Sequence, residues 1–178
     1  YYRDFNIGDV KITFYNAGHI LGSSIIVIEA DGKKIAFTGD LGNNPPHLIK
    51  STDFLETADY CVIESAYGDR IHEPVKEGVI ENLIEDIARD KGVLMIPAFA
   101  MERTQKILYE MHDLFKEKRV PKVPVYLDSP LAIKITEVYK TFKNYFNDET
   151  IKEMKTNFML FDFPGLEKTL TTEESKNI

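Results

Sequence analysis

The spacing of apolar residues changes near Gly68, and this change constrains the fold more than any other feature of the sequence. Before Gly68, short apolar segments alternate with tight-turn sequences, which is typical of strands joined by hairpins. The predicted strands of this part are residues 11–16, 24–30, 34–38 and 60–63. Asp31-Gly32 separates the second strand from the third, and both residue types tolerate the positive φ of a two-residue hairpin turn.

Beyond Gly68 the apolar residues recur at helical spacing, and helices alternate with short strands. The predicted elements are a helix opening at Glu73-Pro74 and ended by Gly92, a strand at 93–96, a helix at 102–118, a strand at 123–127, a helix opening at Ser129-Pro130, a helix at 147–157 and a helix start at 171–174. This alternation predicts an α/β region with parallel strands and right-handed crossovers.

Composition limits the partners and the compartment. The formal net charge of −7 argues against broad electrostatic binding of nucleic acid. It does not exclude a nuclease, because metal ions and a local basic groove can engage phosphates on an acidic protein. No apolar run reaches the roughly 20 residues of a membrane helix. Cys61 is the single cysteine and is interpreted as a small core residue of strand 60–63, which fits a reducing, cytoplasmic compartment.

Three residues that could bind metal or move protons lie where predicted strands end: His19, Asp40 and Glu64. Strand ends are rigid and the loops beyond them are free of ladder hydrogen bonds, which suits metal ligands and catalytic groups. From the residues alone, other interpretations stay open. His19 could be a hydrogen-bonded turn residue, Asp40 a turn or helix cap, and Glu64 a solvated charge.

Five segments, in order, resemble motifs of the metallo-β-lactamase-fold nucleases of the β-CASP group. They are Gly18-His19-Ile20-Leu21-Gly22-Ser23, Phe37-Thr38-Gly39-Asp40, Glu64-Ser65-Ala66-Tyr67-Gly68, the stretch 96–105 and the stretch 126–132. Ala66 departs mildly from the family, which usually has threonine there. The five motifs span most of the chain, and the sequence is similar to bacterial and archaeal ribonucleases related to the eukaryotic cleavage-and-polyadenylation endonuclease.

The resemblance implies roles for particular residues. His19 is expected to bind one zinc ion, Asp40 to bridge two, and Glu64 to orient a histidine that acts in proton transfer. Arg103 and Ser129 are expected to contact phosphates of the substrate. The alternatives for these two, a solvated helix charge and a helix cap, stay open.

The remaining histidines are weaker candidates. His47 and His112 are interpreted as surface residues, and His72 as a loop residue near the third motif.

The resemblance also implies how the chain is organised. Residues 1–68 are expected to be the later part of a metallo-β-lactamase αββα sandwich, and residues 69–178 most of an α/β cap domain. The family's His-x-His-x-Asp-His signature is absent from the sequence. We therefore expect the chain alone to be inactive and to retain zinc poorly, because His19 and Asp40 are too few ligands. We also expect it to expose apolar surface that the strands of a complete sandwich would cover.

The implied function of the full-length protein is zinc-dependent hydrolysis of single-stranded RNA, with two zinc ions in a complete site. A homodimer and a cytoplasmic location are further expectations. Two alternatives stay open: a non-catalytic RNA-binding or scaffold homologue, and a DNA nuclease of the same superfamily.

Overall fold

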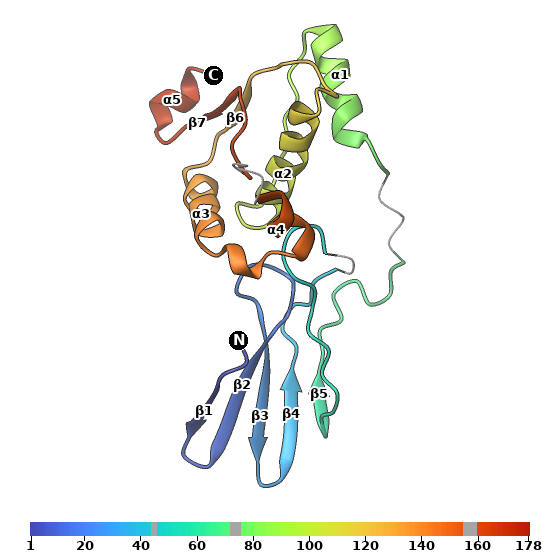
Figure 1. Ribbon diagram of the computed structural model, residues 1–178, viewed down its shortest axis with the longest axis vertical. Helices are drawn as coiled ribbons and strands as arrows, with labels where there is room; N and C mark the ends of the chain where they lie inside the picture. Colours follow the sequence, from blue (N-terminus) through green and yellow to red (C-terminus); the bar gives the residue numbers. More distant parts are fainter. Residues whose placement is uncertain (44–45, 72–75, 155–159) are drawn as a thin grey trace. The chain divides into compact units, whose positions relative to one another are not determined.

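The computed structural model describes residues 1–43, 46–71, 76–154 and 160–178. Its contacts divide the chain into two units, Tyr1–His72 with Asn144–Thr150 and Glu73–Lys143 with Ile151–Ile178 (Figure 1). The predicted domain ranges 1–68 and 69–178 remain a proposal. His72 and the predicted helix opening at Glu73-Pro74 lie outside the described residues, and so does the end of the helix expected at 147–157.

The first unit contains one five-stranded sheet with the order β1-β2-β3-β4-β5 (Figure 1). Its strands are β1 (Asp4–Ile7), β2 (Val10–Asn16), β3 (Ser24–Ala30), β4 (Lys33–Phe37) and β5 (Tyr60–Val62). Neighbours pair antiparallel from β1 to β4, whereas β4 and β5 are parallel. All four predicted strands are confirmed. The additional β1 is short and exposed along its length, so it has no buried alternation by which the sequence could reveal it.

Local turn chemistry and alternating burial explain the centre of this sheet. The β3–β4 turn places Asp31 at φ 50° and Gly32 at φ 69°, as predicted for this hairpin. Along β3, Ile25 and Val27 are buried while their neighbours are less so, which is the period of a half-buried strand. These two side chains form the core with Ala17 and Ala36.

The outer strand β5 carries exposed apolar side chains. All three of its residues are exposed, so the prediction that Cys61 is a core residue is wrong. The physical reason is position: β5 is the last strand of the sheet and pairs with β4 along one edge. The predicted exposure of apolar surface is thus observed at this edge.

The second unit combines helices with a two-stranded parallel sheet, β6 (Val125–Leu127) and β7 (Leu166–Lys168), and confirms the prediction of parallel strands in this part. Its helices in the described residues are α1 (Val79–Asp90), α2 (Arg103–Lys116), α3 (Pro130–Thr141) and α5 (Thr172–Lys176), while the short η1 (Lys143–Tyr145) and α4 (Asp148–Met154) each overlap the segment Asn144–Thr150 of the first unit. The segment 93–96 is not a strand, because its backbone joins no ladder, and Val93 and Met95 are largely exposed. Within the described ranges, no helix is long and apolar enough to cross a bilayer.

The capping residues at the helix ends can be compared with the caps predicted from the sequence. Ser129 caps α3 by accepting a hydrogen bond from the Ala132 N–H, and Thr171 opens α5 with a complete capping box, both as predicted. The end of α1 differs from the prediction. Lys91, not Gly92, adopts the left-handed conformation, with φ 53°. Its N–H donates to the Ile87 carbonyl, so the αL turn comes one residue earlier.

Helices α2 and α3 are joined by the fully buried side-chain amide of Gln105. Gln105 is fully buried, and its Nε2 donates to Thr136 Oγ1 at 2.9 Å and to the Ala100 carbonyl at 3.1 Å. Thr136 in turn donates to the Ala132 carbonyl of its own helix at 2.8 Å. The two hydrogen bonds donated by Gln105 therefore link α2 to α3 and to the segment that precedes α2.

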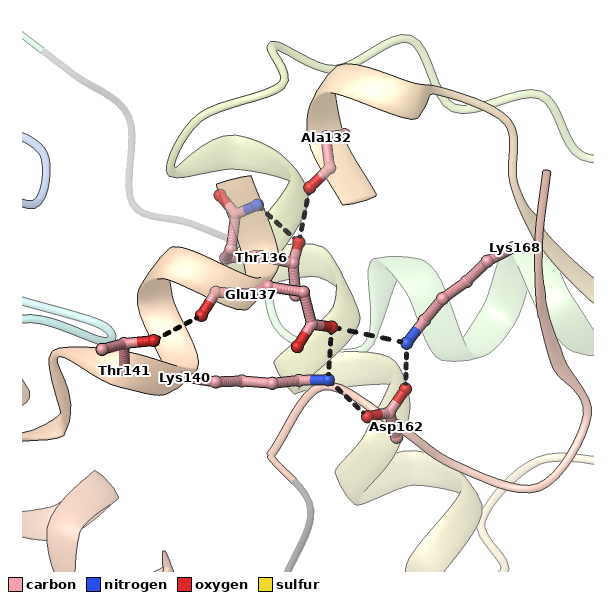
Figure 2. Close-up of polar contacts among 8 residues, drawn as sticks. Ala132, Thr136, Glu137, Lys140, Thr141, Asp162 and Lys168 are labelled. Carbon is pink, nitrogen blue, oxygen red and sulfur yellow. Dashed lines mark hydrogen bonds and ion pairs between the residues drawn. The ribbon is translucent and has the colours of Figure 1, made fainter. Parts of the chain in front are cut away.

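Alternating charges connect α3 with β7 (Figure 2). Lys140 Nζ lies 2.8 Å from Glu137 Oε1 and 2.6 Å from Asp162 Oδ2, and Lys168 Nζ lies 2.5 Å from Asp162 Oδ1. Burial raises the pKa of Asp162, but the two ammonium groups outweigh it and hold the pKa below its ordinary value. The network links β7 to α3, and its charged side chains remain partly exposed to solvent.

His112 is buried, so its interpretation as a surface residue is wrong. It lies on the inner face of α2, where its ring meets Phe163 edge-on with centroids 6.4 Å apart. Burial, with a smaller effect of Lys116, lowers the pKa of His112 to about 4, and Glu153 opposes this shift. The imidazole is therefore neutral at pH 7.

This burial predicts a pH dependence of stability. Below pH about 6.5 the unfolded chain takes up a proton on this imidazole, whereas the folded chain takes it up near pH 4. The free energy of unfolding therefore falls as the pH drops through this window, by up to about 3 kcal/mol at 1.36 kcal/mol per pKa unit. Urea denaturation across the window measures the slope. His112→Phe is expected to flatten it and the exposed-site variant His47→Asn to preserve it; an unchanged slope in His112→Phe contradicts the prediction.

Candidate functional site

The loops that carry His19, Asp40 and Glu64 leave the same edge of the first sheet, namely the edge at which β2, β4 and β5 have their carboxyl ends. Strands β2 and β4 are each antiparallel to β3, and β5 is parallel to β4, so β2, β4 and β5 run in one direction. The three residues follow the carboxyl ends of these strands. The sheet topology thus gathers them at one edge, although they are up to 45 residues apart in sequence.

Two glycines allow close backbone packing around the His19 loop: Gly42 lets the Asp40 loop approach it, and Gly18 lets it approach the segment at Thr52. The Gly42 N–H donates to the Ala17 carbonyl at 2.9 Å. A Cβ on Gly42 would lie 1.8 Å from the Gly18 carbonyl oxygen, and a Cβ on Gly18 would lie 2.5 Å from the Thr52 backbone nitrogen. No side chain fits at either contact, so glycine is required at both positions.

A hydrogen-bond network below the His19 loop was not predicted from the sequence. Asp53 Oδ2 accepts from the Asn16 N–H at 2.6 Å, and the Asp53 N–H donates to the Asn16 carbonyl at 2.9 Å. The Asn16 side chain also donates to the Ser51 carbonyl and accepts from the Gly18 N–H. Asn16 is buried, so this network fixes the turn from which His19 projects.

The His19 turn is closed by a serine, and its imidazole faces outward. Ser23 Oγ accepts from the backbone N–H groups of His19 at 3.1 Å and Ile20 at 3.2 Å. The His19 side chain is exposed. The loop therefore fixes the backbone of His19 and leaves the residue exposed to solvent.

Glu64 braces the turn that contains Asp40. Its Oε1 accepts from the Leu41 N–H at 2.5 Å, and its own N–H donates to Thr38 Oγ1 at 3.2 Å. Asp40 itself is exposed. The carboxylate of Glu64 thus contacts the backbone next to Asp40, and the expected role of orienting a histidine stays a prediction.

Arg103 and Ser129 belong to the second unit. Arg103 is the exposed first residue of α2, directly after Glu102, whose φ is 61°. Ser129 caps α3 through its Oγ. The cap alternative for Ser129 is therefore observed, and its hydroxyl hydrogen still offers a donor. Phosphate contact by either residue stays a prediction.

The donors at the first sheet's edge have the right chemistry for zinc. An exposed imidazole and an exposed carboxylate on adjoining loops are typical zinc ligands. Among residues 1–43, 46–71, 76–154 and 160–178, no group of three or more His, Cys, Asp or Glu residues could hold a metal ion. His19 and Asp40 therefore fit as part of a ligand set.

Comparison with known proteins agrees with the motifs. Residues 104–178 match the family model of the Beta-Casp domain. A ribonuclease of Thermus thermophilus is 34% identical over 96% of this chain and 39% of its own length. An RNase J-like protein of Methanocaldococcus jannaschii is 37% identical over 88% of this chain and 38% of its own.

A eukaryotic relative extends this similarity. Cleavage and polyadenylation specificity factor 73 of Drosophila melanogaster is 30% identical over 88% of this chain and 24% of its own length. The chain thus spans about two fifths or less of these relatives. With the mixed α/β structure described above, these similarities show that the chain belongs to the β-CASP ribonuclease family.

Proposed function

We propose that the whole protein hydrolyses phosphodiester bonds of single-stranded RNA at the edge of the first sheet. The observation that carries this proposal is the convergence of the His19, Asp40 and Glu64 loops, held by the contact between Gly18 and Gly42. The ribonuclease names of the relatives support RNA as the substrate class.

Membership in a family of metallo-hydrolases implies dependence on a metal in general. We propose zinc, with two ions in a complete site, His19 as a ligand of one ion and Asp40 as a ligand of both. A carboxylate can offer one oxygen to each of two ions that lie roughly 3.5–4 Å apart. Bound zinc supplies Lewis-acid stabilisation of the negative charge that develops on the phosphate.

The chain's own residues supply position and donors. Glu64 accepts from the Leu41 N–H and so holds the turn that presents the Asp40 carboxylate. Ser23 holds the His19 backbone in the same way. Arg103 has a planar guanidinium that can donate hydrogen bonds to two phosphate oxygens. Ser129 can donate a hydrogen bond through its hydroxyl while its oxygen accepts one from the Ala132 N–H.

Cleavage of labelled single-stranded RNA and of DNA with the same sequence tests this function in the whole protein. We expect RNA to be cut, activity to disappear with a chelator, and zinc to restore it. Preferential cutting of DNA would instead identify a DNA nuclease. RNA binding without cleavage of either strand would identify a scaffold homologue.

The proposal extends to the state and location of the whole protein. We propose a homodimer, which light scattering of the whole protein measures, and a cytoplasmic location, which cell fractionation measures.

A further inference from the structure

The loop after Glu64 presents an aromatic ring with a guanidinium over it. Arg70 Cζ lies 5.1 Å from the centroid of the Tyr67 ring, within the range of a cation–π contact. Both groups remain open to solvent, with 62% of Tyr67 and 67% of the Arg70 side chain exposed. The Arg70 N–H donates to the Tyr67 carbonyl at 2.9 Å, so a tight turn holds the two side chains together.

The backbone of this loop is held in an uncommon conformation beside the Asp40 turn. Tyr67 has φ 61°, in the left-handed region that bulky residues rarely adopt. Such strain persists where the surroundings fix it, and it is concentrated at functional sites. Three residues earlier, Glu64 Oε1 accepts from the Leu41 N–H, which ties the start of the loop to the residue after Asp40.

We propose that Tyr67 and Arg70 form a stacking platform for one nucleobase of single-stranded RNA next to the Asp40 turn. This inference rests on the proposed function and names the contact that positions its substrate. Every nucleobase has a π-face, so stacking on an aromatic ring extended by a guanidinium plane is tolerant of sequence.

The local charges favour a base over a phosphate on this platform. Asp69 Oδ1 lies 4.0 Å from Arg70 Nε, so a carboxylate beside the guanidinium weakens its attraction for a phosphate. The net charge of −7 also gives little general attraction for the RNA backbone. Affinity must therefore come from local contacts, and an exposed stacked pair beside the site supplies one.

Binding of labelled single-stranded RNA to the whole protein tests the platform, in an Asp40→Asn background so that the RNA is not cut. Tyr67→Asn removes the ring, and asparagine tolerates the positive φ. We expect about tenfold weaker binding. A set of RNAs, each with a single abasic ribose at a different position, locates the stacked base. With Tyr67 present, the abasic site should weaken binding about tenfold at one position. In Tyr67→Asn, an abasic site at that same position should cause no further loss of affinity. Tyr67→Phe, which keeps the ring, should bind as the parent does.

Controls separate the platform from general effects. Phe54→Ala removes another highly exposed aromatic ring of the same unit and should leave affinity unchanged. Arg70→Lys keeps the charge and loses the plane, so we expect about threefold weaker binding with an unchanged salt dependence. Wild-type affinity in Arg70→Lys overturns the assignment of Arg70.

Two further results overturn the assignment of Tyr67. One is an unchanged RNA affinity in Tyr67→Asn. The other is that, at every position of the RNA, the affinity lost through the abasic site adds to the affinity lost through Tyr67→Asn. Photocrosslinking of RNA with 5-iodouridine at the sensitive position needs no variant, and absence of the Tyr67 adduct also overturns the proposal. Because these readouts measure binding, failure of the platform is distinct from failure of RNA cleavage, which the wild-type protein reports.

Discussion

Replacing Asp40 by asparagine in the whole protein should reduce RNA cleavage by about 10³-fold with little change in stability. Asparagine keeps the shape of the side chain but removes the charge through which one carboxylate could hold two cations. Loss of a group that stabilises charge in the transition state typically costs a factor of this size. Asp40 is exposed, and surface substitutions usually change stability by less than about 0.5 kcal/mol.

The zinc content of the purified protein gives a second readout for Asp40→Asn, and we expect it to fall. Asp31→Asn is the matched control, because Asp31 is also exposed and its hairpin precedes β4, at the opposite edge of the sheet. Asparagine tolerates the positive φ at that position. Full activity and zinc content in Asp40→Asn would show that the metal assignment is wrong.

Elements governed by local interactions could be predicted from the sequence. The β3–β4 hairpin follows from Asp31-Gly32, because the residues that need positive φ are adjacent in the chain. The caps at Ser129 and Thr171 follow from hydrogen bonds that span three residues. In each case the sequence window contains every group that decides the structure.

Burial could not be predicted in the same way, because it depends on what packs from elsewhere. Cys61 has the apolar neighbours of a core strand, yet β5 ends its sheet and exposes it. His112 has charged neighbours in the sequence, yet Phe163, which is distant in the sequence, packs against its ring. The segment 93–96 has strand composition, but a strand also requires a partner for its backbone.

The candidate site divides along the same line. Resemblance identified His19, Asp40 and Glu64 by residue type and order, and the topology of the sheet then places their loops at one edge. The Asn16–Asp53 network that supports them joins residues 37 apart, and nothing near Asp53 signals a partner at that distance. The contact between Gly18 and Gly42 is equally non-local: Gly18 lies in the first motif, but Gly42 lies outside all five motifs and no sequence signal pointed to it.

Replacing Gly42 by alanine should damage both stability and activity, unlike the change at Asp40. The new Cβ would lie 1.8 Å from the Gly18 carbonyl oxygen and 2.9 Å from the His19 nitrogen. Both are backbone atoms, so no side-chain rotation relieves the clash. Overpacking of this kind costs about 3 kcal/mol. Because the clash separates the His19 loop from the Asp40 loop, we also expect zinc content and RNA cleavage to fall in protein that is still folded.

Gly92→Ala provides the comparison for Gly42→Ala. An added Cβ at Gly92 meets one side-chain atom, Ile87 Cγ2, at an ordinary 3.9 Å, so this variant should fold and cleave RNA as the wild type does. The free energy of unfolding of each variant, measured with urea, and the zinc retained by the folded fraction separate the two effects. A Gly42→Ala protein with wild-type stability would mean that the two loops do not touch. One that is less stable but fully active would mean that their contact supports the fold and not the metal ligands.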